Sequence, residues 1–124
     1  MQIIVGGTDR YLSTTLAEIL GTFNARCIRT NKVERIINEL KQPDRLVILD
    51  MNWEDLQERG VLKQLINIGN ISGNKVLVVC PNQEEDLKKI ARNARPAEVF
   101  IRFDLYADFK EYLGEFLKHG KAPA

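Results

Sequence analysis

Apolar residues along this chain gather into short continuous runs that alternate with longer stretches of helical spacing. The strongest run, Leu46-Val47-Ile48-Leu49, ends in the carboxylate of Asp50. A continuous run of this kind is typical of a strand that helices cover on both faces. Together with similar runs it predicts five strands, over residues 2–5, 25–30, 45–50, 75–80 and 98–103.

Between these runs the apolar positions recur every three or four residues, as on one face of a helix. The predicted apolar stripes cover residues 12–23, 33–40, 61–68, 87–94 and 109–117. Helix starts are expected at polar residues suited to N-caps, namely Thr8 or Asp9, Asn31, Asn82 and Asp104, and stops at Asn24, Pro43, Gly69 and Pro96. Strict alternation of strands and helices predicts an α/β fold with a doubly wound parallel sheet.

The length of 124 residues predicts one domain, over residues 1–118, with 119–124 as a tail or the start of a linker. A net charge of +1 gives no field that favours direct binding to nucleic acid or to a membrane. The N-terminus lacks a signal-peptide pattern, and no apolar run is long enough to span a bilayer. Cys27 and Cys80 have no metal-ligand spacing and are expected to be reduced thiols in a cytoplasmic protein.

Asp50 is the first candidate for chemistry, because ligands in open α/β sheets bind at the carboxyl ends of the strands. The loop Gly6-Gly7-Thr8 also follows a strand and precedes a helix, where backbone amides bind anions, but it lacks the spacing of a dinucleotide or Walker loop. The sole histidine, His119, lies in the predicted tail, so a catalytic pair with Cys80 is not expected.

The strand that ends at Asp50, the later Gly60 before a helix, and the strand Val76-Leu77-Val78-Val79-Cys80 resemble the receiver domain of bacterial response regulators. The resemblance covers residues 2–117. It implies a flavodoxin-like (βα)5 fold, with a five-stranded parallel sheet in the order 2-1-3-4-5. It also implies that Asp50 occupies the position that accepts a phosphoryl group from a histidine kinase, with a divalent cation to neutralise charge.

Four positions depart from the pattern of that family. Gly6 and Gly7 replace its acidic pair, Cys80 replaces a Ser or Thr, and Arg102 (or Phe103) replaces a lysine. The departures indicate a pseudo-receiver without enzyme activity, bound metal or other cofactor, in which Asp50 is a vestigial phosphoacceptor. Its carboxylate is then expected to accept hydrogen bonds from loop amides or to pair with Arg102.

Two alternatives remain open. One is an active atypical receiver that phosphorylates Asp50 and holds Mg²⁺ with Asp9, Asp50 and water. The other is a flavodoxin-like ligand-binding domain or small enzyme that uses the loop from Gly6 to Asp9.

Charged stripes on the last two predicted helices indicate a contact surface. Arg92, Arg95 and Lys88 form a basic stripe, and four acids form another, at Asp104, Asp108, Glu111 and Glu115. Opposite stripes of this kind can pair within one chain or across a symmetric interface, and the alternative is two solvated helix faces. The resemblance implies a homodimer or target complex through the elements 82–95, 98–103 and 104–117. Trp53, in an acidic loop, is either a further anchor for a regulatory protein or an effector domain, or folds back onto the domain itself.

Overall fold

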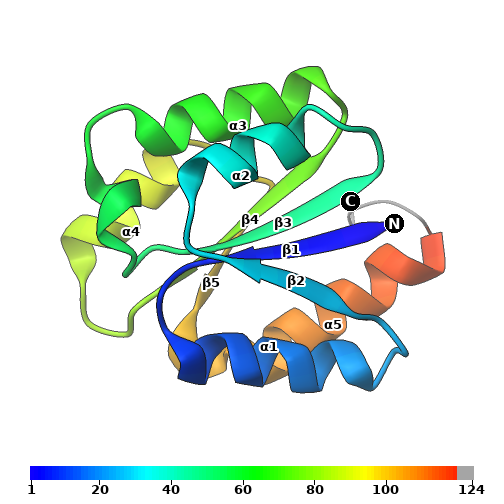
Figure 1. The fold of residues 1–124 in the computed structure, drawn as a ribbon. Coiled ribbons are helices and arrows are strands. Elements are labelled where there is room, and N and C mark those ends of the chain that lie inside the picture. The colour runs from blue at the N-terminus through cyan, green and yellow to red at the C-terminus, as the bar shows by residue number, and fades with distance from the viewer. Residues whose placement is uncertain (120–124) are drawn as a thin grey trace.

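The computed structural model describes residues 1–119, which form a parallel sheet between two layers of helices (Figure 1). The strands are β1 (Gln2–Gly6), β2 (Cys27–Thr30), β3 (Arg45–Asp50), β4 (Lys75–Cys80) and β5 (Glu98–Ile101). The helices are α1 (Arg10–Gly21), α2 (Val33–Leu40), α3 (Val61–Ile71), α4 (Glu85–Asn93) and α5 (Leu105–His119), with 3-10 helices η1 (Glu54–Gln57) and η2 (Arg102–Asp104). The strands follow the order β2-β1-β3-β4-β5, which confirms the predicted flavodoxin-like topology.

The continuous apolar runs are explained by the helices on both faces of the sheet. Helices α1 and α5 cover one face, where Ile48 packs with Leu16 and Phe109. Helices α2, α3 and α4 cover the other, where Val47 packs among buried residues such as Ile36. Figure 1 shows these two layers below and above the sheet. Alternate residues of the central strands therefore point into two different cores, and both must be apolar.

Several element boundaries differ from the prediction for local reasons. Helix α3 continues past Gly69 to Ile71, because this buried glycine lets the helix approach Val76 of β4 and Leu40 of α2. Asn31 does not cap α2; the N-cap is Lys32, whose amide donates to the Thr30 hydroxyl.

The ends of α4 and β5 also lie apart from their predicted positions. Helix α4 starts at Glu85, not at Asn82, and β5 ends at Ile101 in the 3-10 helix η2. Within residues 1–119, no helix combines the length and apolar character that crossing a bilayer requires. The predicted tail 119–124 lies outside the described residues except for His119, which ends α5.

Candidate functional site

Asp50 ends the central strand β3 and lies at the carboxyl edge of the sheet, between β1 and β4. Its side chain is buried, with 5% of the residue exposed. One oxygen, Oδ1, accepts a hydrogen bond from the amide of Asn52 at 3.0 Å. The other, Oδ2, is buried and has no hydrogen-bond partner within residues 1–119. Burial raises the pKa of Asp50 above its ordinary value of 3.8, although the Asn52 amide acts in the opposite direction.

Gly6, which ends β1, and Gly7, which follows it, are closely packed. A Cβ atom on Gly7 would lie 2.9 Å from Cβ of Asp50, which is closer than real Cβ atoms approach. A Cβ atom on Gly6 would lie 2.8 Å from the Leu49 side chain and 3.3 Å from Trp53. Side chains at either position would therefore require neighbouring atoms to move. The start of the β1–α1 loop lies directly against Asp50 because Gly7 has no side chain.

Asp9 is the nearest other carboxylate candidate, and both of its oxygens are engaged. Its Oδ1 accepts from the amides of Tyr11 and Leu12 at 2.9 and 3.2 Å, so Asp9 is the N-cap of α1 as the sequence predicts. Its Oδ2 lies 2.8 Å from Nη1 of Arg102. Partial burial disfavours the charged carboxylate, but the hydrogen bonds from Leu12, Arg102 and Tyr11 and the Arg102 charge outweigh it. The pKa of Asp9 is therefore lowered from 3.8.

The ion pair to Asp9 decides between the two partners predicted for Asp50. Arg102 forms its ion pair with Asp9 and not with Asp50, while the predicted loop amide is the one from Asn52. Arg102 lies in η2 after β5, at the same sheet edge as the N-terminus of α1, so its guanidinium reaches the capping residue. Asp9 and Asp50, two neighbouring acids, consequently have pKa values shifted in opposite directions.

Cys80 ends β4 at the carboxyl edge of the sheet. Its thiol is fully buried, and burial raises its pKa to about 11, partly offset by the charges of Arg92 and Lys88. It is consequently a protonated thiol at neutral pH and a weak hydrogen-bond donor. Within residues 1–119, no group of three or more acidic, histidine or cysteine side chains is arranged to hold a metal ion.

Trp53 is buried, so of its two predicted arrangements it folds back onto the domain and is not an exposed anchor. Only 3% of the residue is exposed, and its ring packs in the core beneath α2 and α3. The space beside Gly6 admits this ring, because the glycine leaves room that a larger side chain would fill. The tryptophan therefore holds the β3–α3 loop onto the domain.

The three residues of the predicted basic stripe do not lie together on one exposed face of α4. Lys88 is 8% exposed, and its Nζ donates to the Asn82 carbonyl at 2.7 Å and to Glu85 at 3.1 Å, so it stabilises the start of α4. Arg92 remains exposed on α4, but Arg95 lies beyond the helix in a left-handed conformation with φ of 57°. The acids are all exposed, with Asp104 in η2 and the other three in α5. The three acids of α5 line a groove together with Glu98 of β5.

Sequence reasoning missed three exposed aromatic residues near the Asp9–Arg102 ion pair. Phe103 is 83% exposed, Tyr11 78% and Tyr106 53%. The apolar stripes identify residues that face a core, and these three lie outside the stripes. The ion pair joins the β1–α1 loop to η2, and so brings together the segments that carry them. We call Tyr11, Phe103 and Tyr106 the aromatic surface.

No protein-family model matches this sequence, and comparison with curated proteins gives no match either. Solved structures do match. A response regulator receiver protein from Pseudoalteromonas atlantica has a TM-score of 0.75 at 13% identity, covering 98% of this chain and 100% of that one. The phosphorylated cyanobacterial phytochrome response regulator RcpA has a TM-score of 0.67 at 16% identity, covering 99% of each chain. A pilus assembly protein CpaE from Caulobacter crescentus has a TM-score of 0.63 at 16% identity, covering 98% of this chain and 94% of that one.

These similarities show that the chain has the fold of response-regulator receiver domains. At such identities the likeness concerns the fold, and function has to be argued from the site.

Proposed function

We propose that this chain is a receiver-fold module of two-component-type signalling that works by binding another protein, and that Asp50 is not phosphorylated by the Mg²⁺-dependent route. The observation that carries the proposal is the ion pair between Asp9 and Arg102. It occupies the one acid that could join Asp50 in holding a cation, at an edge where Gly6 and Gly7 supply no side-chain oxygen.

Phosphoryl transfer to a carboxylate requires a divalent cation to neutralise charge on the transferring group. Mg²⁺ needs near-octahedral oxygen ligands and is usually held by carboxylates. Here Asp9 is engaged by two amides and a guanidinium, and only Oδ2 of Asp50 is unpartnered. Releasing Asp9 would break the cap of α1 and the ion pair together. Mg²⁺ is therefore expected to bind weakly, and phosphorylation to be slow.

The test is intact-protein mass spectrometry after incubation with acetyl phosphate and millimolar Mg²⁺. We expect no phosphorylated species, while a receiver that carries the acidic pair reacts under the same conditions. A stoichiometric adduct that disappears in Asp50→Asn would overturn the proposal in favour of an active atypical receiver. The fluorescence of Trp53, which packs beside Gly6, gives a second readout: Mg²⁺ should leave it unchanged.

The aromatic surface supports the protein-binding part of the proposal. Large aromatic side chains are enriched at the centres of protein interfaces. Phe103 is 83% exposed, so most of its ring is not packed against the domain. It also lies next to Arg102, so a partner there would contact the residue that holds Asp9. A protein bound at this surface could thus favour one arrangement of the β1–α1 loop over another.

A second copy of the chain is one such partner. Arg92 and Arg95 are exposed, as are Asp108 and Glu111 on α5, so opposite charges remain available for a symmetric contact. The test is sedimentation of the double variant Arg92→Glu/Arg95→Glu, with Arg35→Glu, exposed on α2, as the matched control. We expect weaker self-association only in the double variant. Equal behaviour of both proteins would exclude this dimer.

A further inference from the structure

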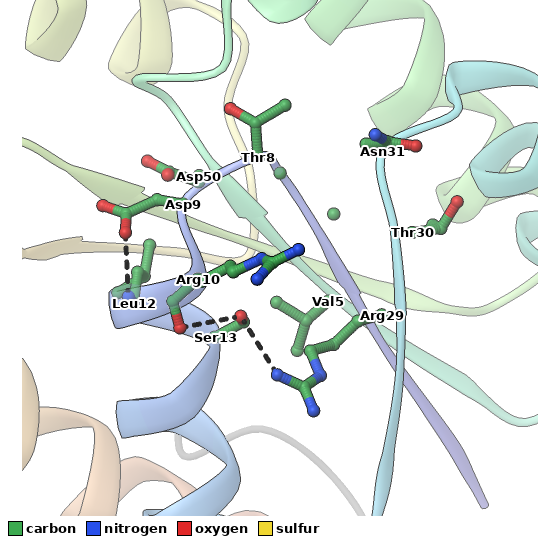
Figure 2. A pocket seen from close by; sticks show the side chains of 12 residues that line it. Val5, Thr8, Asp9, Arg10, Leu12, Ser13, Arg29, Thr30, Asn31 and Asp50 are labelled. Carbon is green, nitrogen blue, oxygen red and sulfur yellow. Dashed lines mark hydrogen bonds between the residues drawn. The ribbon is translucent and has the colours of Figure 1, made fainter.

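A pocket of about 460 Å³ opens at the carboxyl edge of the sheet, between the β1–α1 loop and the end of β2 (Figure 2). Val5 and Leu12, both buried, form part of its apolar wall. It lies beside Asp50, where the strand order changes direction between β1 and its two neighbours, β2 and β3. Small molecules bind preferentially at such positions in open α/β sheets. The volume lies within the range of roughly 300–1,000 Å³ that small-molecule sites have.

Two guanidinium groups line this pocket without an acidic partner. Arg10 comes from the start of α1 and Arg29 from β2, and Figure 2 shows them on either side of Val5. Within residues 1–119 neither makes an ion pair, whereas Arg102 and Arg45 both do. Nη1 of Arg29 donates a long hydrogen bond, of 3.5 Å, to the hydroxyl of Ser13. Arginine donates in a fork that matches the oxygens of a phosphate group.

Three other side chains of the pocket can donate hydrogen bonds to an anion. The hydroxyls of Thr8 and Thr30 and the amide of Asn31 line it with the two arginines. The Ser13 hydroxyl also lines the pocket, but it already donates to the Arg10 carbonyl at 3.1 Å. The amides of Tyr11 and Leu12 in the first turn of α1 do not contribute, since Asp9 already accepts from both. The charged donors that an anion in this pocket would meet are the side chains of Arg10 and Arg29.

Two carboxylates also line the pocket, and neither removes its positive character. Asp9 is paired with Arg102 at 2.8 Å, so its charge is compensated outside the arginine pair. Asp50 has its pKa raised by burial, which favours the uncharged form. With Asp50 ionised, the charges of Arg10 and Arg29 still exceed its single negative charge.

We propose that this pocket binds a small organic phosphate, with Arg10 and Arg29 holding the phosphate group and the rest of the cavity taking the organic part. The site does not depend on the proposed lack of phosphorylation, because it uses residues of β1, α1 and β2 and needs no metal. It adds a ligand-responsive function to the domain: a molecule bound between these two loops lies next to Asp50 and to the Asp9–Arg102 ion pair.

The test is NMR titration of the ¹⁵N-labelled protein with inorganic phosphate and with AMP, at constant ionic strength set by chloride. We expect saturable shifts centred on the amides of Gly7, Thr8, Thr30 and Asn31, with AMP saturating at lower concentration than inorganic phosphate. Shifts that are absent, that do not saturate or that spread over the surface would overturn the site. Equal affinity for AMP and inorganic phosphate would overturn its assignment to an organic phosphate.

Variants separate a built site from general attraction of anions. Arg10→Gln and Arg29→Gln should each weaken binding about tenfold or more, since each removes a charged donor to phosphate. Arg26→Gln is the matched control: it removes an exposed arginine that precedes β2, at the opposite end of the strand from Thr30, and should leave affinity unchanged. Asp50→Asn should strengthen binding, because it removes the opposing charge. If Arg26→Gln weakens binding as much as the other two variants, the attraction is non-specific and the proposal is wrong.

Discussion

Replacing Asp9 tests the central feature of the site, because this residue both caps α1 and pairs with Arg102. The variant Asp9→Ala removes an N-cap with hydrogen bonds of 2.9 and 3.2 Å, and loss of such a cap costs about 1 kcal/mol, within a range of roughly 0.5–2. It also removes an ion pair whose side chains are 31% and 26% exposed, which contributes about 0.2–1 kcal/mol. We therefore expect a loss of about 0.7–3 kcal/mol in the free energy of unfolding at neutral pH.

The two contributions can be separated by the choice of side chain. Asp9→Ser keeps an oxygen that caps the helix but cannot pair with Arg102, so it should lose no more than about 1 kcal/mol. Urea unfolding followed by circular dichroism measures wild type and both variants. The single variant Arg102→Gln and the double variant Asp9→Ser/Arg102→Gln then complete a cycle that isolates the pair. A loss in Asp9→Ser as large as that in Asp9→Ala would refute the assignment of most of the effect to the cap.

The pH dependence supplies a further check on the same residue. The pKa of Asp9 is lowered in the folded protein from its ordinary value of 3.8, so its charged form stabilises the fold. That stabilisation is complete above the unfolded pKa and is lost as the pH falls through 3.8 toward the lower folded pKa. The difference between wild type and Asp9→Ala should therefore shrink in acid. A difference that stays constant down to the folded pKa would contradict the ion-pair and capping assignment.

The remaining predictions concern neighbouring positions. Asp50→Asn should stabilise the protein at pH 7, because the raised pKa of Asp50 means that wild-type stability falls as pH rises through 3.8 and the higher folded pKa; urea unfolding across that window measures it. Gly7→Ala should destabilise by about 1–3 kcal/mol, since its Cβ atom would lie 2.9 Å from Asp50. Gly21→Ala, with nothing within 4 Å, is the control and should be neutral or stabilising. Trp53→Ala should cost about 3–5 kcal/mol, as for other buried aromatic residues, in thermal or urea unfolding.

Each of these outcomes has a clear opposite. An Asp50→Asn protein that is less stable than wild type at pH 7 would mean that the carboxylate has a stabilising partner. A fully stable Gly7→Ala would show that the β1–α1 loop does not need its close approach to Asp50. If Trp53→Ala lowered the free energy of unfolding as little as a substitution of an exposed residue, Trp53 would not be buried in the core.

The sequence alone determined the architecture and the place of Asp50 within it. Continuous apolar runs and helical stripes are local patterns, and each depends on residues a few positions apart. Alternation of strands and helices then leaves few topologies, because crossovers between parallel strands are right-handed. The position of Asp50 at the end of the strand Arg45–Asp50 follows from that pattern, as does the capping role of Asp9.

Only the tertiary structure decided which partners the polar and aromatic side chains take. Arg102 could reach either Asp9 or Asp50, Lys88 could point to solvent or fold back on the Asn82 carbonyl, and Trp53 could face a partner or fill the space beside Gly6. These choices join residues far apart in sequence or depend on the rotamers of long side chains, so no local periodicity records them. The presence of Arg10 and Arg29 in one pocket has the same origin, since parallel pairing of β1 and β2 brings the end of β2 beside the start of α1.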